Sequence, residues 1–329
     1  MPLPIKPGEV LRGRYRIVER IGQGGMGNIY LAEDTRLEGR KCALKEVEHD
    51  PNLPEKVIQE ARDQFLREAT VLARLDHPNL PKVSDFFSVN EKDYLIMDYV
   101  PGKDLRLLML EAKGNNSFLN ERDVLSWAGQ LTDALTYMHR QSPPIVHRDI
   151  KPSNLKITPD GLLKLVDFGL VKVLAPDEET ITIIQGQGTL LYTPLEQYGG
   201  SEAHTDVRSD VYAFGATLYH LLTGQAPVDA RQRFLHPDSL IAPHKINSAI
   251  SARTEKAILW AMELHPDARP ESIESLRQFL FGTKELPSRP LGRSRRGIAL
   301  EIFFAPPESI LFGLGAVLLL LSLIATLGH

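Results

Sequence analysis

The spacing of apolar residues changes partway along the chain. Short alternating segments rich in β-branched and aromatic residues fill residues 15–114, which predicts mostly strands there. One amphipathic segment from about Glu55 to Leu75 predicts a helix among them. From Asn120 onward a helical period dominates, and its first apolar stripe consists of Val124, Trp127, Ala128, Leu131, Ala134, Leu135 and Met138. A β-rich part followed by an α-helical part predicts a bilobal α+β fold with a cleft between the lobes.

A different pattern begins near the C-terminus, where residues Ile310 to Leu327 carry no charge. At roughly 1.5 Å per residue this run would form a helix about 27 Å long, close to the hydrocarbon core of a bilayer. Basic residues precede it at Arg289, Arg293, Arg295 and Arg296, which favours a cytoplasmic location for the bulk of the chain. We therefore expect one transmembrane helix and a single-pass protein of the cell membrane. A buried helix of the soluble part, or a hairpin partner within an oligomer, is the alternative.

A Pro-, Gly- and Arg-rich stretch, Gly282 to Gly297, separates the two patterns and is typical of a linker. The sequence thus predicts a folded domain over 11–281, a juxtamembrane linker over 282–309 and a transmembrane helix over 310–327. The net charge of −4 does not indicate a nucleic-acid binder. The single cysteine, Cys42, excludes an intrachain disulfide and a cysteine-built zinc site.

A glycine-rich segment, IGQGGMGNIY, places Gly22, Gly24 and Gly27 in a GxGxxG arrangement. Glycine lets backbone amides approach a phosphate closely, although a plain flexible turn shows the same composition. The residues that follow are β-branched and aromatic, so the loop joins two strands. A dinucleotide-binding loop instead opens a helix. The strand–loop–strand context favours a flap that covers nucleotide phosphates.

Two charged residues lie where the pattern expects apolar ones. Lys45 ends the strand Cys42-Ala43-Leu44-Lys45, and alternation places it on the same face as Ala43. A small residue can lie against a planar base there while the lysine reaches the phosphates. Glu68 interrupts the apolar stripe of the 55–75 helix. An unpaired inward charge would be costly, so we expect Glu68 to pair with Lys45. A solvated strand end and a surface glutamate are the alternatives.

The segment HRDIKPSN, His147 to Asn154, is followed by LVDFG, which ends at Gly169. Asp160-Gly161 between them is a strong signal for a two-residue hairpin turn. Pairing outward from that turn sets Asn154 opposite Asp167, so two oxygen ligands for Mg²⁺ would meet at the open end of the hairpin. Asp149 lies just upstream, positioned to accept a hydroxyl proton.

These motifs, in this order, resemble the protein-kinase family, specifically the bacterial serine/threonine kinases related to eukaryotic ones, over roughly Leu11 to Phe281. The resemblance implies a β-rich N-lobe and an α-helical C-lobe. It also implies transfer of the γ-phosphate of ATP to serine and threonine hydroxyls of protein substrates, with Mg²⁺, or Mn²⁺ as an alternative ion. The family match further implies that Asp149 is the catalytic base, that Lys151 steadies the γ-phosphate, and that Asn154 and Asp167 hold the metal.

The nucleotide site follows from the same resemblance. Met97 would be the gatekeeper beside the base, and the Asp98 carbonyl and Val100 amide would read adenine. The other residues expected around ATP are Ile21, Gly22, Gln23, Gly24, Gly25, Met26, Gly27, Ile29, Ala43, Lys45, Glu68 and Leu155.

Supporting roles are implied as well. Asp210 resembles the residue that anchors the backbone of the catalytic loop, and Arg269 would pair with Glu196. Where the family ends its activation segment with a small residue, proline and glutamate, this chain has Thr193-Pro194-Leu195-Glu196. We expect this departure to affect substrate choice rather than ATP or metal binding.

The segment between Asp167 and Glu196 also contains Thr180 and Thr182. A phosphate on either threonine could dock on Arg148, which predicts regulatory autophosphorylation. The alternative is that both are ordinary loop residues.

Other functions remain open from the sequence. A pseudokinase scaffold is one, although Lys45, Asp149 and Asp167 are all present. A small-molecule kinase of the same fold is another, although such enzymes lack the glycine-rich flap and a comparable activation segment. The expected partners are protein substrates and the membrane, with no nucleic acid; a homodimer is a further alternative.

Overall fold

The computed structural model describes residues 4–24, 27–49, 52–90, 92–167, 172–173, 190–198 and 206–282. The predictions for Gly25, Met26, Thr180, Thr182 and the 310–327 helix lie outside these residues, as does nearly all of the expected linker. Among the helices of the described residues, none has the length and apolar character needed to cross a bilayer.

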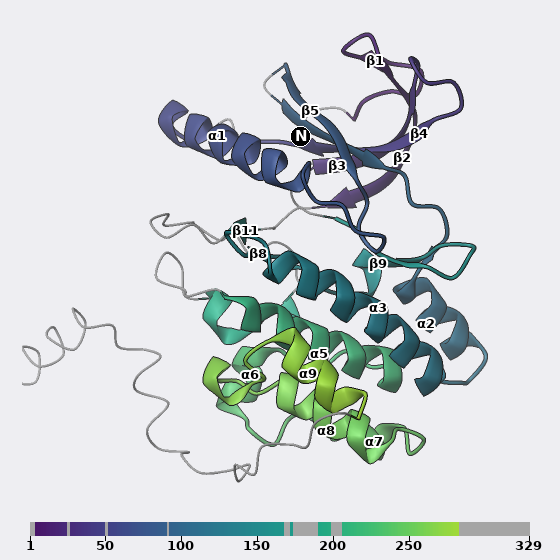
Figure 1. The fold of residues 1–329 in the computed structure, drawn as a ribbon, viewed down its shortest axis with the longest axis vertical. Coiled ribbons are helices and arrows are strands. Elements are labelled where there is room, and N and C mark those ends of the chain that lie inside the picture. Colours follow the sequence, from purple (N-terminus) through teal and green to yellow (C-terminus); the bar gives the residue numbers. More distant parts are fainter. Residues whose placement is uncertain are drawn as a thin grey trace, which may run out of the picture. The chain divides into compact units, whose positions relative to one another are not determined.

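The N-terminal lobe is a six-stranded antiparallel sheet with the strand order β1-β2-β3-β4-β6-β5 (Figure 1). The strands are β1 (Val10–Leu11), β2 (Tyr15–Gly24), β3 (Gly27–Asp34), β4 (Lys41–Val47), β5 (Val83–Val89) and β6 (Lys92–Asp98). Alternate residues of these strands form one buried cluster, which includes Tyr15, Ile17, Tyr30, Ala32, Cys42, Leu44, Phe87, Tyr94 and Ile96. The expected β-rich lobe is therefore confirmed.

One helix, α1 (Glu55–Leu72), packs against this sheet at β5 and β6 (Figure 1). Only Ala69 and Leu72 of its residues are buried, and both lie in its last turn. Phe65, the other apolar residue of the expected inner face, is partly exposed. Most of α1 is thus held weakly by apolar burial, and this bears on the position of Glu68 described below.

The C-terminal lobe is mainly helical, as expected. Its helices are α2 (Leu105–Gly114), α3 (Glu121–His139), α5 (Val207–Thr223), α6 (Ala230–Leu235), α7 (Pro243–Ile246), α8 (Ala252–Ala261) and α9 (Ile273–Leu280). Short β-segments line its upper edge: β7 (Lys103–Asp104), β8 (Ile145–Val146), β9 (Leu155–Ile157), β10 (Leu163–Leu165) and β11 (Lys172–Val173). The 3₁₀ turns are η1 (Pro152–Asn154), η2 (Leu195–Tyr198) and η4 (Pro266–Ala268).

Helix α5 is the centre of this lobe, because it packs against α3, α8 and α9. Every residue from Ser209 to Thr223 except His220 is buried, as expected for a helix that is apolar on all sides. Asp206 caps its first turn by accepting from the Arg208 amide, and Gly224 ends it in the left-handed conformation. The helix therefore provides a rigid floor for the loops above it.

In the β9–β10 hairpin, the observed pairing differs by one residue from the pairing predicted from the sequence. Ile157 pairs with Leu163 and Leu155 with Leu165, so the Asn154 carbonyl accepts from the amide of Val166 rather than facing Asp167. The turn contains three residues, because Gly161 takes a positive φ of 84° and the Thr158 side chain bonds Leu162 across it. The Asp160-Gly161 pair predicted the position of the turn correctly, but the predicted turn length of two residues was wrong.

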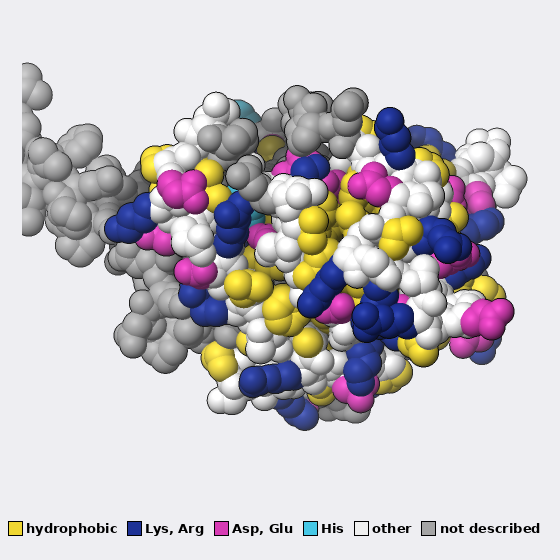
Figure 2. All heavy atoms as spheres, turned by 90° about the horizontal axis from the view of Figure 1, so that it is seen from above, with side chains coloured by type: hydrophobic (Ala, Val, Ile, Leu, Met, Phe, Trp, Pro, Cys, Tyr) yellow, Lys and Arg dark blue, Asp and Glu magenta, His cyan; other side chains and the backbone are white. Residues whose placement is uncertain are grey.

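The face seen from above in Figure 2 carries Lys and Arg side chains interspersed with Asp and Glu, and hydrophobic side chains lie among them. On that face, the described residues show no field of one charge sign.

Gly215 is the closest point between α5 and α8. A Cβ placed there would lie 2.7 Å from the Ala261 Cβ and 3.0 Å from the Met262 Cγ. Alanine in a helix is ordinarily favoured over glycine by about 1 kcal/mol, but overpacking a core costs about 1–3 kcal/mol. We expect Gly215→Ala to lower the free energy of unfolding by about 1–2 kcal/mol in urea denaturation. Gly114→Ala, at the end of α2 with nothing within 4 Å, is the control and should be neutral or stabilising. An unchanged midpoint for Gly215→Ala would contradict the close packing.

Candidate active site

The loop that carries HRDIKPSN is held from below by one buried carboxylate. Asp210, on α5, accepts from the His147 amide with Oδ2 and from the Arg148 amide with Oδ1, each at 2.8 Å. His139 Nε2, at the end of α3, lies 2.8 Å from the same Oδ2. Burial alone would raise the pKa of Asp210, but the contact with His139 and the amide hydrogen bonds hold it below the usual range. The expected anchoring role of Asp210 is confirmed in its geometry.

This anchoring holds the loop in an uncommon backbone conformation. Arg148 has φ of 68° and Asp167, just after β10, has φ of 72°. Non-glycine residues cost roughly 1–3 kcal/mol in sparsely populated regions, and they persist where surrounding contacts over-determine them. Both strained residues flank the same cleft, which is where such strain is commonly found.

Asp149 has one carboxylate oxygen engaged and one left available. Lys151 Nζ donates to Oδ2 at 2.8 Å, and Asn154 Nδ2 donates to the same oxygen at 2.9 Å. Oδ1 is buried, and among the described residues no donor reaches it. A buried carboxylate oxygen without a donor is costly, so this one is suited to accept a bond from an incoming group. The structure therefore brings Asp149, Lys151 and Asn154 together as expected.

The expected partner of Lys45 is wrong. Lys45 Nζ forms its ion pair with Asp167 Oδ1, and among the described residues no ion pair joins it to Glu68. The Glu68 carboxylate instead accepts from Gln64, one turn earlier on α1, at 3.0 Å. The middle turns of α1 bury no residue, so apolar packing does not draw this part of the helix toward Lys45. The charge of Glu68 acts on Arg148 as well. Burial acts to raise the pKa of Asp167, but Lys45 outweighs this and lowers it.

The residues expected to hold a metal fit Mg²⁺ by their donor chemistry. Asn154 supplies an amide oxygen and Asp167 an ionised carboxylate, and both are hard oxygen ligands. Within the described part of the chain there is no cluster of three or more His, Cys, Asp and Glu side chains that could hold an ion alone. Mg²⁺ usually takes one or two protein ligands and completes its shell with phosphate oxygens and water. This donor set therefore suits an ion that binds together with a phosphorylated substrate.

The residues expected to bind the nucleotide lie on four neighbouring strands, β2, β3, β4 and β6. Ala43 pairs with Met97 between β4 and β6, and both are buried. Ile29 pairs with Lys45 between β3 and β4, and Gly22 pairs with Ile29 across the glycine-rich turn. Ile21, Gln23 and Gly24 belong to the same end of β2.

At Gly27 a Cβ would lie 2.1 Å from the Glu46 carbonyl oxygen, so only glycine fits where the flap crosses β4. Beyond the sheet, Asp98 ends β6 and Val100 follows within the segment that joins the two lobes, which we call the hinge (residues 98–104). Most described members of the expected nucleotide site thus lie at the β2–β3 turn, on β4 and β6, and along this hinge, whereas Glu68 lies on α1 and Leu155 on β9.

Leu155 does not behave as a cleft residue. It is 1% exposed within the core, whereas the next residue, Lys156, reaches the hinge and donates to the Val100 carbonyl at 2.6 Å. Strand alternation shows that the neighbouring residues Leu155 and Lys156 of β9 point to opposite faces, so only one of them can face the hinge. Lys156 is the site residue that the sequence reasoning missed.

The segment Leu190–Tyr198 is fixed to the C-lobe by a buried ion pair. Arg269 forms two hydrogen bonds to Glu196, at 2.6 and 2.9 Å, and its side chain is fully buried. The early proline does not prevent this, since the Pro194 carbonyl accepts from Gln197 and starts the turn η2. The expected Glu196–Arg269 pair is confirmed. Tyr192 in the same segment contacts His220 of α5, with its hydroxyl 2.6 Å from Nδ1.

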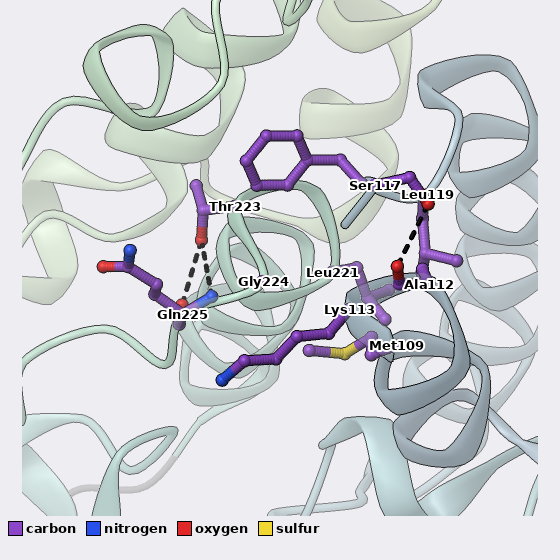
Figure 3. Close-up of a pocket in the computed structure, with 10 residues that line it drawn as sticks. Met109, Ala112, Lys113, Ser117, Leu119, Leu221, Thr223, Gly224 and Gln225 are labelled. Atoms are coloured by element: carbon purple, nitrogen blue, oxygen red, sulfur yellow. Dashed lines mark hydrogen bonds between the residues drawn. The ribbon is translucent and has the colours of Figure 1, made fainter. Parts of the chain in front are cut away.

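The pocket shown in Figure 3 lies away from this cleft. It has a volume of about 170 Å³ and is lined by the end of α2, residues 117–119 and the end of α5, including Met109, Leu119, Leu221 and Thr223. None of the expected site residues lines it. Its size is below the range typical of cofactor or substrate sites, so it does not compete with the cleft as the functional site.

Known proteins share this arrangement of motifs. The chain is 34% identical over 276 residues to the serine/threonine-protein kinase PrkC of Bacillus subtilis, covering 82% of this chain and 40% of PrkC. It is 33% identical over 314 residues to the DNA damage-responsive serine/threonine-protein kinase RqkA of Deinococcus radiodurans, covering 90% of this chain and 44% of RqkA. The chain thus spans less than half the length of these curated relatives.

The fold has counterparts among solved structures. The kinase domain of PknI from Mycobacterium tuberculosis is 26% identical, with a TM-score of 0.64 over 85% of this chain and 100% of that domain. The family model described as the protein kinase domain matches residues 15–281. That match covers most of the chain and contains every residue of the cleft described above, so the chain belongs to the protein kinase family.

Proposed function

We propose that this chain is an ATP-dependent serine/threonine protein kinase. The observation that carries the proposal is the environment of Asp149. One oxygen is held by Lys151 and Asn154, and the other is buried without a donor among the described residues. That arrangement suits a base that receives a hydroxyl proton in a site already able to hold phosphates.

The reaction follows from the positions of these groups. A serine or threonine hydroxyl of the substrate protein donates a hydrogen bond to Asp149 Oδ1. Its oxygen forms a bond to the γ-phosphorus of ATP as the bond from that phosphorus to the β–γ bridging oxygen breaks. The proton passes to Asp149, and ADP leaves. Lys151, adjacent to Asp149, lies where its charge favours the transferred phosphoryl group. Asn154 and Asp167 would hold a magnesium ion, which would supply positive charge to neutralise the phosphates.

The ion pair between Lys45 and Asp167 describes a resting arrangement in this proposal. While Lys45 neutralises Asp167, neither group is directed at its proposed ligand, phosphate for the lysine and metal for the carboxylate. Glu68 lies on a helix that is buried only at its last turn, so a rotation of α1 could bring it to Lys45. Lys45 would then exchange one carboxylate for another, and Asp167 would become available to the metal.

The two rival functions are less well supported. A pseudokinase scaffold does not need Asp149, Lys151 and Asn154 bonded to one another in the cleft. A small-molecule kinase does not need a segment such as Leu190–Tyr198 fixed by a buried Glu196–Arg269 pair beside that cleft. That segment suits the docking of a peptide.

Attachment to the membrane is a further part of the proposal. Residues 310–327 are uncharged and long enough, as a helix, to span a bilayer, and arginines precede them. Single-pass anchoring would confine the kinase to protein substrates at the cytoplasmic surface of the membrane.

The base role predicts a large loss of catalysis in Asp149→Asn. General-base catalysis typically contributes about 10²–10⁴-fold, so phosphate transfer from labelled ATP should fall by that factor while ATP binding by calorimetry is retained. Mass spectrometry of the wild type would show whether Thr180 or Thr182 receives phosphate. Asp123→Asn, at an exposed position of α3, is the matched control and should remain active. Undiminished transfer by Asp149→Asn would contradict the assignment.

The exchange of partners at Lys45 predicts that Glu68 matters for turnover but not for stability. Glu68→Gln should lower kcat at saturating ATP by at least about tenfold, equivalent to about 1.4 kcal/mol of barrier, and leave Tm nearly unchanged. Glu60→Gln removes an exposed charge from the same helix, where Glu60 lies 3.9 Å from Lys56, and should have no effect. Equal kcat values for both variants would argue against movement of α1.

Membrane anchoring predicts that the full chain sediments with membranes after a carbonate wash, whereas a chain ending at Phe281 remains in the supernatant and still transfers phosphate. Fractionation followed by immunoblotting measures this. Recovery of the full chain in the supernatant would contradict the transmembrane assignment.

A further inference from the structure

Lys156 occupies an unusual position for a lysine in a short strand. It is the second residue of β9, between the buried Leu155 and the hairpin turn, and its side chain is directed at the hinge rather than at solvent. Its Nζ donates to the Val100 carbonyl oxygen at 2.6 Å and lies 5.5 Å from the centre of the Tyr99 ring. Both contacts belong to the segment expected to read the base of ATP.

The surroundings show that this contact is part of the packed structure. Asp104 pairs with Lys156 between β7 and β9, and its side chain caps α2 by accepting from the Leu107 amide at 2.8 Å. Burial lowers the pKa of Lys156, and the charge of Asp104 acts in the opposite direction. Lys156 is partly buried, and its ammonium donates to the Val100 carbonyl.

The hinge cannot move away from β9 without rearrangement. Gly102 has a positive φ of 106°, and a Cβ there would lie 2.0 Å from the Ile157 carbonyl oxygen. The backbone of the hinge therefore lies directly against β9, which fixes the separation of Lys156 from Val100.

We propose that Lys156 is a specificity-determining residue of the nucleotide site, whose ammonium takes one lone pair of the Val100 carbonyl and places a positive charge beside it, so that the hinge favours ligands that use the Asp98 carbonyl and the Val100 amide. This inference rests on the proposed ATP site. It concerns which planar ligands that site accepts, not whether phosphate is transferred.

The consequence depends on the order of donors and acceptors along a ligand's edge. An adenine ring donates from its amino group to the Asp98 carbonyl and accepts from the Val100 amide, so it leaves the Val100 carbonyl alone. A 2-anilinopyrimidine presents its acceptor and donor side by side, and would need both the amide and the carbonyl of Val100. Its anilino N–H would have to share the Val100 carbonyl with the Lys156 ammonium, and two donors at one oxygen, one of them cationic, repel each other. The site should therefore favour the adenine pattern over the anilinopyrimidine pattern.

The test compares two small probes on the full-length protein and on Lys156→Met, which keeps an unbranched apolar stem but has no donor. The probe 7-azaindole has the adenine pattern, and 2-anilinopyrimidine has the other; their dissociation constants are measured by displacement of a non-hydrolysable ATP analogue. Lys156→Met should bind 2-anilinopyrimidine about tenfold more tightly, because one hydrogen bond becomes available. Affinity for 7-azaindole and for the ATP analogue should change by less than about threefold.

Two further variants keep the test decisive. Lys156→Arg retains a cationic donor and should keep the wild-type preference. Lys156→Ala frees the carbonyl but removes the stem, so the ratio of the two dissociation constants should shift in the same direction as in Lys156→Met. An unchanged ratio in Lys156→Met or Lys156→Ala would overturn the proposal. Failure of the wild type to bind both the ATP analogue and 7-azaindole would instead contradict the proposed kinase function.

Discussion

The carboxylate of Asp210 is the contact on which the rest of the cleft depends. It lies in a helix buried on nearly all sides, and its two oxygens accept the backbone amides of His147 and Arg148. Those bonds hold the loop in a conformation that includes a positive φ at Arg148, and so decide where Asp149 points. Burying this charge is tolerable because His139 and the amides satisfy it. Helix α5 thus fixes the conformation of the loop that carries Asp149.

Around this anchor, charged side chains are arranged in three ion pairs, and the proposed reaction exchanges the partners in the cleft only. Lys45 is bound to Asp167, Lys151 to Asp149, and Arg269 to Glu196. The last pair lies outside the cleft and is fully enclosed on the arginine side, which suits a permanent structural role. The first two lie where phosphates and metal are expected, so each holds a charge in place until a ligand replaces its partner. The same physical rule, that buried charges are paired, therefore serves both stability and the proposed reaction.

A charged side chain is also held in place at the hinge, where the base of the nucleotide is expected to bind. Lys156 is held on the Val100 carbonyl by the short distance between β9 and the hinge, which Gly102 makes possible. A side chain from the C-lobe thereby limits the hydrogen-bonding groups that the connecting segment can present. Selectivity in this site would come from a Val100 carbonyl that already accepts from Lys156, rather than from a further side chain that contacts the ligand.

The sequence alone predicted the two lobes, which the structure confirms, because they depend on local periodicity. Its closely spaced motifs also singled out the flap glycines and Asp149, Lys151, Asn154 and Asp167 as candidate site residues. The family resemblance also supplied the long-range contacts of Asp210 and of Glu196 with Arg269. Only the tertiary structure decided which carboxylate pairs with Lys45, since that depends on how far α1 is drawn toward the cleft. It also decided the hairpin register, and it showed that Lys156 rather than Leu155 contacts the hinge. A strand has a side-chain period of two, so an error of one residue reverses the face, and packing alone decides between the two.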